Sequence, residues 1–219
     1  MPHLAPSVPP LNHPSIITQP KPPKTQNTKQ TKNQTTPQKT KITSDVRFAS
    51  LPLCAESQRA LSEGLRYEFC TKVQAMSLPA CLSGTDVVCK AKTGSGKTIA
   101  FLLPAIESIK ANPSRPRNSV ACLVISPTRE LAAQIAAEAA KLVQFHRPAL
   151  SVQCVVGGTN MKSEASKMAA HAPDILVATP GRLIDHLKNG GLAPALQAAG
   201  GLQTLVFDEA DQLLDMGFR

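Results

Sequence analysis

The sequence predicts an α/β fold in which a parallel sheet carries helices on both faces. Three features lead to this prediction. Short apolar runs that suit strands alternate with longer segments of helical periodicity from residue 48 onward. These runs contain few polar positions, which fits strands that are buried on both sides. A glycine-rich loop follows the first run and consecutive acidic residues follow the last, as expected at the ligand-binding edge of such a sheet.

The predicted elements follow one another in a regular order. Two helices come first, at 57–65 and 71–82, and a short buried strand at 86–90 leads into the glycine-rich loop. After this loop, helices are expected at 97–110, 128–143, 161–170 and 181–188. The remaining strands are expected at 120–126, 150–156, 174–178 and 202–207. Helices between successive strands are the crossovers that parallel pairing requires.

Composition and charge exclude several classes of protein. No apolar run is long enough to span a bilayer, so an integral membrane protein is not expected. The six cysteines are scattered without a Cys-x-x-Cys pair, which argues against a disulfide framework or a zinc site. The net charge is +9, but six lysines without any acidic residue or arginine place +6 in residues 1–44. The remainder carries only +3, so bulk charge is weak support for an anionic partner.

The glycine-rich loop has the spacing of a phosphate-binding loop. It consists of Ala91, Lys92, Thr93, Gly94, Ser95, Gly96, Lys97 and Thr98, with alanine at the first position where glycine is usual. Glycines let the backbone N–H groups point at phosphate oxygens, and the following helix adds its positive N-terminal end. Lys97 is expected to reach the β and γ phosphates, and the Thr98 hydroxyl to bind Mg²⁺. Taken alone, the run also fits a plain turn between a strand and a helix.

The acidic pair Asp208–Glu209 follows the last predicted strand, 111 residues after Lys97. Both motifs are therefore expected at the carboxyl ends of strands, where open α/β sheets bind ligands. We expect Asp208 to hold Mg²⁺, and Glu209 to orient and deprotonate an attacking water. A lone acidic cluster is more often solvated surface, but the two motifs in this order predict hydrolysis of a nucleoside triphosphate.

A third motif precedes the phosphate loop and reads Arg66-Tyr67-Glu68-Phe69-Cys70-Thr71-Lys72-Val73-Gln74, with Gln74 placed 23 residues before Lys97. From about residue 48 to 219 the chain resembles the first RecA-like domain of DEAD-box ATP-dependent RNA helicases. The resemblance implies that Tyr67 stacks on adenine, that Gln74 pairs with the base edge, and that Phe48 packs nearby. ATP is therefore the implied nucleotide. Two positions depart from the family pattern: Arg66 stands where glycine is usual, and Lys72 where proline is usual.

Three further motifs resemble those with which the family holds the RNA backbone. They are Pro127-Thr128-Arg129, Gly157-Gly158 and Thr179-Pro180-Gly181-Arg182, and each follows a predicted strand. Hydroxyls, arginines, helix N-termini and bare glycine backbone suit phosphate contacts, which implies RNA binding without readout of base sequence. In isolation, the same residues also fit helix caps and turns.

The resemblance also implies parts beyond Arg219. The family continues with a Ser-Ala-Thr motif, whose strand lies between the phosphate-loop strand and the acidic strand, and with a second RecA-like domain that supplies arginine fingers. We therefore expect the chain to be a fragment of a longer helicase, weakly active or inactive alone. Two alternatives stay open at this point: a truncated, non-catalytic module that binds RNA or nucleotide, and an unrelated phosphate-loop ATPase.

Residues 1–44 differ from the predicted ATP-binding domain at 45–219. They are rich in proline, threonine, glutamine, asparagine and lysine, with few large apolar side chains, so we expect them to be disordered. Two interpretations stay open. The segment suits a transit peptide for a mitochondrion or plastid, because it lacks acidic residues and is rich in hydroxyls. It also suits a basic arm that attracts RNA in a nuclear or cytoplasmic protein.

Overall fold

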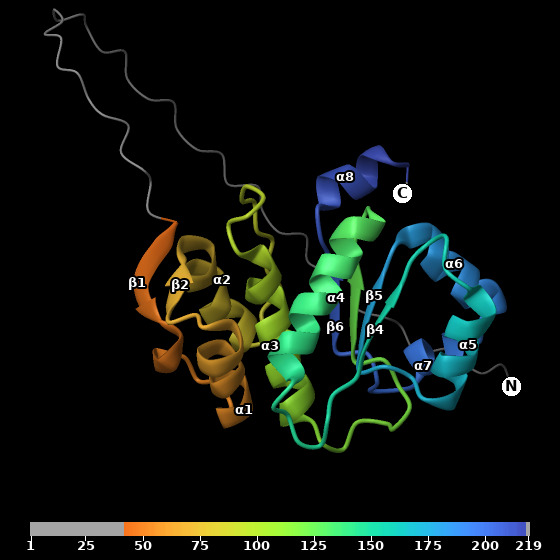
Figure 1. Cartoon of the computed structure of the whole chain (residues 1–219), viewed down its shortest axis with the longest axis horizontal. Coiled ribbons are helices and arrows are strands. Elements are labelled where there is room, and N and C mark those ends of the chain that lie inside the picture. Colours follow the sequence, from red (N-terminus) through yellow and green to blue (C-terminus); the bar gives the residue numbers. More distant parts are fainter. Residues whose placement is uncertain (1–41, 218–219) are drawn as a thin grey trace, which may run out of the picture. The chain divides into compact units, whose positions relative to one another are not determined.

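A computed structural model describes residues 42–217, and a four-stranded parallel sheet lies at its centre (Figure 1). The strand order is β4–β5–β3–β6. The strands are β3 (Cys122–Ile125), β4 (Val152–Val155), β5 (Ile175–Ala178) and β6 (Thr204–Phe207). Cys122 lies opposite Ile175 on one side and Thr204 on the other, so β3, β5 and β6 end level with one another. The predicted α/β class and parallel sheet are confirmed.

Helices cover both faces of this sheet, as predicted (Figure 1). One face carries α3 (Lys97–Ala111) and α4 (Arg129–Val143), and the other carries α5 (Met161–Ala170), α6 (Pro180–Asn189) and α7 (Ala193–Gln197). Successive strand residues point to opposite faces. Val124 packs in the core with α3 and α4, whereas its neighbour Leu123 packs in the core with α5, α6 and α7. The short helix α7 was not predicted.

An N-terminal unit packs against α3. The short antiparallel strands β1 (Thr43–Arg47) and β2 (Phe69–Thr71) enclose a 3-10 turn at Phe48–Ser50, helix α1 (Ala55–Arg59) and a π-helical turn at Ala60–Leu65. Helix α2 (Lys72–Leu82) follows and contacts α3. Thr71 caps α2 through a reciprocal capping box with Gln74. Of the expected disordered segment, Thr43 and Ser44 belong to β1, and residues 1–41 lie outside the described residues.

The predicted strand at 86–90 is wrong for this structure. Residues 85–92 have no regular secondary structure, and the Val88 side chain is fully exposed. A strand needs a hydrogen-bonded neighbour. Among residues 42–217, β6 pairs only with β3, and its other edge leaves Leu205 and Phe207 about half exposed. The family resemblance implies a further strand between these two segments, and within residues 42–217 neither segment has a partner on that side.

The last described helix, α8 (Ala210–Asp215), follows the acidic pair directly. It buries Leu213, whereas Leu214 stays 60% exposed. Every helix in the described part of the chain is too short or too polar to cross a lipid bilayer.

Candidate functional site

The phosphate loop has the curled backbone that its glycines predict. Gly94 and Gly96 have φ angles of 77° and 92°, which glycine adopts without strain. A Cβ atom at Gly96 would lie 2.6 Å from Nε2 of Gln74, so space as well as backbone conformation requires glycine here. The Ser95 hydroxyl is buried and has no hydrogen-bond partner among the described residues. The loop therefore holds an unsatisfied polar atom beside the N-terminus of α3.

The structure brings Lys97 and Glu209 together across 112 residues of sequence. The Lys97 ammonium donates to Glu209 Oε1 at 3.1 Å and to the carbonyl oxygen of Ala91 at 2.8 Å. Glu209 follows β6 with a left-handed backbone, at φ 49° and ψ 51°. Non-glycine residues adopt this conformation at a cost, and such strain is concentrated at functional sites. The phosphate loop and the acidic pair thus form one site at the carboxyl edge of the sheet.

Asp208 is buried beside this ion pair, with 7% of its surface exposed. Its backbone N–H donates to the carbonyl of Ile125 and continues the pairing of β6 with β3. Burial raises the pKa of Asp208, the charge of Glu209 raises it further, and Lys97 partly opposes both. A buried carboxylate with a second carboxylate next to it favours a nearby cation. These residues therefore fit a Mg²⁺ ion.

Thr98, the other predicted Mg²⁺ ligand, is partly buried in the first turn of α3. Burial raises the pKa of Glu138 on α4, and the charge of Lys141 and the nearby Thr98 hydroxyl only partly oppose this rise. The hydroxyl thus already has a carboxylate neighbour on the helix side.

Gln74 links the adenine motif to the phosphate loop. Its side chain is buried, its Oε1 accepts from the backbone N–H of Thr71 at 2.7 Å, and its Nε2 donates to the carbonyl of Gly96 at 2.9 Å. A primary amide has two N–H groups and two lone pairs, so one donor and one acceptor remain for a base. The predicted pairing with adenine stays a prediction.

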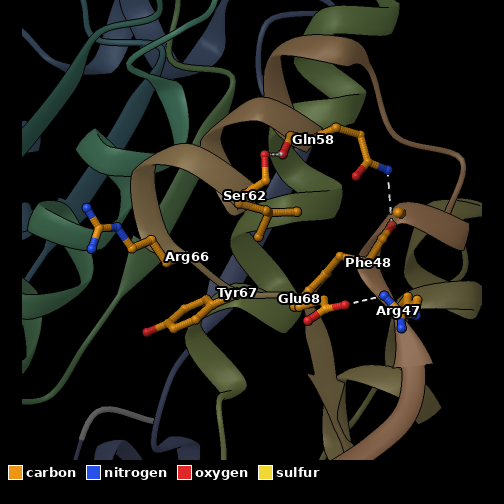
Figure 2. Close-up of a pocket in the computed structure, with 9 residues that line it drawn as sticks. Arg47, Phe48, Gln58, Ser62, Arg66, Tyr67 and Glu68 are labelled. Carbon is orange, nitrogen blue, oxygen red and sulfur yellow. Dashed lines mark hydrogen bonds and ion pairs between the residues drawn. The ribbon is translucent and has the colours of Figure 1, made fainter.

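The aromatic residues of this region have different environments. Tyr67 is 45% exposed and projects outward, which suits stacking on a base, whereas Phe48 is 2% exposed and belongs to the core (Figure 2). Both line a hollow of about 250 Å³ together with Arg47, Ala49, Gln58, Leu61, Ser62, Arg66 and Glu68. Gln58 donates to the carbonyl oxygen of Phe48 at 3.0 Å and fixes its backbone. The backbone N–H of Phe48 also donates to the carbonyl of Glu68 at 3.0 Å, so Phe48 supports the turn that presents Tyr67.

Arg66, which replaces the family's glycine, adopts the left-handed conformation that glycine would adopt, with φ at 57°. Its side chain points away from Phe48 (Figure 2). Glycine would remove the backbone strain of the folded state, but it would also give the unfolded chain more conformational entropy. Because the first free energy is the larger, Arg66→Gly is expected to stabilise the fold by about 0.5–1 kcal/mol. Urea unfolding would show a higher midpoint with an unchanged slope.

A second left-handed residue provides the control for this substitution. Asn118 has φ at 61°, but its Oδ1 accepts from the backbone N–H of Ala172. Asn118→Gly would relieve similar strain and lose that hydrogen bond, so we expect no gain in stability. An Arg66→Gly chain no more stable than the unaltered chain would contradict the expectation.

The three motifs with RNA-binding resemblance meet at one hollow of about 330 Å³ at the carboxyl edge of the sheet. It is lined by Pro127, Arg129, Gly157, Thr179, Pro180, Gly181, Arg182, Asp185 and Met216. Thr128 caps α4 by accepting from the N–H of Leu131 at 3.2 Å. Gly158 has φ at 89°, and a Cβ there would lie 2.7 Å from Nη1 of Arg129. Asp185 and Met216 were not predicted.

The two arginines of this hollow differ in their surroundings. Arg129 is exposed, and its guanidinium has no hydrogen-bonding partner within residues 42–217. Arg182 is 9% exposed and donates from Nε to Glu164 at 2.9 Å and from Nη2 to Thr159. The predicted contact of Arg182 with phosphate stays untested, but most of its donors are already occupied.

The chain is similar to a known protein family and to proteins of several organisms. Residues 71–219 match the family model described as DEAD/DEAH box helicase. The chain belongs to this helicase family. Among its relatives, DEAD-box ATP-dependent RNA helicase 26 of Oryza sativa subsp. japonica is 51% identical over 177 residues, which are 80% of this chain and 32% of the relative. ATP-dependent RNA helicase HAS1 of Candida albicans is 45% identical over 174 residues, which are 80% and 29%.

A solved structure of the helicase family supports the same assignment. DEAD-box helicase Mss116, bound to ssRNA and UDP-BeF, matches 80% of this chain and 35% of its own with a TM-score of 0.70 and 33% identity. The predicted RecA-like domain and the predicted family are thus confirmed. The chain spans about a third of the length of these relatives.

Helicase motifs alone did not reveal Glu164 and His186, which surround Arg182. Glu164 lies on α5 and His186 on α6, and no motif joins them. The one available signal was periodicity: His186 follows Arg182 by four residues, which places both on one face of a helix.

Proposed function

We propose that the chain is the ATP-binding and RNA-binding part of an ATP-dependent RNA helicase, which hydrolyses ATP and opens short duplexes or remodels RNA. The contact between Lys97 and Glu209 carries this proposal. It puts a cation suited to the phosphates and a carboxylate suited to the attacking water within 3.1 Å of each other. The names of the relatives, all ATP-dependent RNA helicases, support the same activity.

Lys97 and Glu209 neutralise each other in this structure. When ATP enters, the ammonium of Lys97 exchanges Glu209 and the Ala91 carbonyl for the β and γ phosphates. The freed Glu209 carboxylate then orients a water molecule and accepts its proton. Backbone N–H groups of residues 92–96 and the N-terminus of α3 bind the remaining phosphate charge.

Asp208 and Thr98 would hold the Mg²⁺ that accompanies ATP, Asp208 directly or through water. The ion supplies positive charge to the phosphates when it is bound. Buried Asp208 next to Glu209, and the unpartnered hydroxyl of Ser95, support a charged ligand at this position.

RNA would bind along the hollow that joins the three backbone-contacting motifs. Arg129, the hydroxyl of Thr179 and the bare backbone of Gly157 and Gly181 provide contacts for phosphate and sugar. The binding of ssRNA by Mss116 supports this assignment. Because these groups reach the backbone, we expect little preference for base sequence.

Substitution of Gln74 by alanine tests the nucleotide. We expect ATP affinity to fall by about fivefold to a hundredfold, because a buried hydrogen bond to adenine is lost. GTP presents a different base edge, so its affinity should change less. Competition of each nucleotide with a fluorescent ATP analogue would give the ratio. Equal losses for both nucleotides would show that Gln74 acts through its bond to Gly96 of the phosphate loop, and that result would contradict its pairing with adenine.

Phosphate release separates the helicase from the non-catalytic module. Stimulation of phosphate release from ATP by single-stranded RNA would establish turnover by this chain. ATP and RNA binding without any release would instead support a module that binds without catalysis.

The location of the protein is a separate proposal. The acid-free, lysine-bearing residues 1–44 support either import into a mitochondrion or plastid or a basic arm in the nucleus or cytoplasm. A fluorescent protein fused behind residues 1–44 would accumulate in an organelle in the first case. A diffuse signal would exclude import.

A further inference from the structure

A polar cluster whose charged members are buried lies behind the proposed RNA-binding hollow, where α5, α6 and the glycine loop meet. We call it the Glu164 cluster, and its members are Thr159, Glu164, Arg182 and His186. Oε2 of Glu164 accepts from Arg182 Nε at 2.9 Å and lies 2.8 Å from His186 Nε2. Oε1 of Glu164 accepts from the Thr159 hydroxyl. The three charged or titratable side chains are 12% exposed or less.

The cluster fixes the loop that follows the glycine pair. Nη2 of Arg182 donates to the backbone carbonyl of Thr159 and, at 3.0 Å, to its hydroxyl. That carbonyl lies one residue beyond Gly158, whose α-carbon faces the guanidinium of exposed Arg129. The Arg182 side chain, near the start of α6, thus fixes the position of the glycine loop relative to Arg129.

The charges of the cluster depend on one another. Burial works against ionisation of Glu164, but hydrogen bonds from Thr159, His186 and Arg182 outweigh it and lower the pKa of that carboxyl. The ionised Glu164 pairs with Arg182, so the charge that Arg182 could offer a phosphate is largely compensated. Breaking a buried pair by removal of one partner leaves the other charge uncompensated.

We propose that Arg182 is a positioning residue, held by Glu164, which His186 contacts in turn, and that it fixes the glycine loop for RNA instead of binding phosphate itself. This role differs from the one that the family resemblance implies, and it rests on the proposed RNA binding at the hollow. Arg129, whose guanidinium is exposed, is then the arginine that meets phosphate. The two roles predict opposite effects of one substitution.

The decisive variant is Glu164→Gln in the full chain. A positioning role predicts that affinity for RNA falls by about tenfold, because the loop loses its anchor. A phosphate-binding role for Arg182 predicts tighter RNA binding, because the carboxylate that competes with phosphate is gone. The measurement is fluorescence anisotropy of a labelled uridine decamer with a non-hydrolysable ATP analogue, over about 50–200 mM KCl.

The salt dependence gives a second readout that a structural change alone does not move. Arg129→Ala should reduce the slope of log affinity against log salt by about one, because one phosphate contact is lost. Arg182→Gln should lower affinity and leave the slope unchanged. The double variant Glu164→Gln/Arg182→Gln should bind no more weakly than the weaker single variant, since both act through one anchor.

Thr159→Val provides a second test of the positioning role if the Glu164→Gln chain does not fold. It removes hydroxyl contacts from an exposed position without stranding a charge, and we expect about a threefold loss of RNA affinity. Thermal melting would verify that each variant is folded. Unchanged or tighter RNA binding in both Glu164→Gln and Thr159→Val, or a reduced slope in Arg182→Gln, would overturn the positioning role. Absence of RNA binding by the unaltered chain would overturn the proposed function, and the positioning role with it.

Discussion

Lys97→Ala is expected to weaken ATP binding by roughly two to three orders of magnitude. The Lys97 ammonium is the one side-chain cation within 3.1 Å of the acidic pair among the described residues. Its removal leaves the β and γ phosphates without their point charge and exposes them to the charges of Glu209 and Asp208. Isothermal titration calorimetry with ATP and Mg²⁺ would measure the loss.

Lys141→Ala is the matched control for this substitution. Lys141 is an exposed lysine on α4, and its removal changes the net charge equally. ATP affinity should then stay close to that of the unaltered chain. Equal losses in the two variants would mean that ATP responds to overall charge and not to this side chain, which would contradict the assigned role of Lys97.

Glu209→Gln is expected to reduce ATP hydrolysis by about 10²–10⁴-fold and to leave ATP bound at least as tightly. The amide keeps the size of the side chain but cannot accept a proton from water, and it removes a negative charge that repels the γ phosphate. Single-turnover phosphate release with saturating RNA would measure the rate, and titration with ATP would measure the affinity.

Asp215→Asn controls for the loss of a carboxylate near the acidic pair. Asp215 is exposed at the end of α8, six residues after Glu209. Its replacement should leave the rate unchanged. Phosphate release from Glu209→Gln at the rate of the unaltered chain would show that another group accepts the proton.

The sequence predicted the site best where chemistry and topology depend on the same residues. Parallel strands end at one edge, so the order of the motifs was enough to bring Lys97 and Glu209 together, and the structure places them in contact. Glycine spacing likewise predicted a curled loop, and Gly94 and Gly96 have positive φ angles. In both cases a local pattern determines where the backbone goes.

Prediction was wrong or incomplete where a residue depends on a distant partner. The run 86–90 has the composition of a buried strand, but pairing requires a neighbour that residues 42–217 do not provide. The contact of Arg182 with phosphate stays a prediction, but its motif did not reveal that Glu164 from another helix pairs with it. Contacts between separate helices depend on packing, and a single sequence does not specify them.

The Gln74 amide links the segment that is proposed to bind adenine to the phosphate loop. This amide joins the N-terminus of α2 to the carbonyl of Gly96, one residue before the lysine of the phosphate loop. A base that recruits this amide must therefore alter or reinforce the restraint on Gly96. Nucleotides that differ only in their base would then restrain the phosphate loop to different degrees. The identity of the base would thereby control the rate at which the γ phosphate reacts as well as the affinity for the nucleotide.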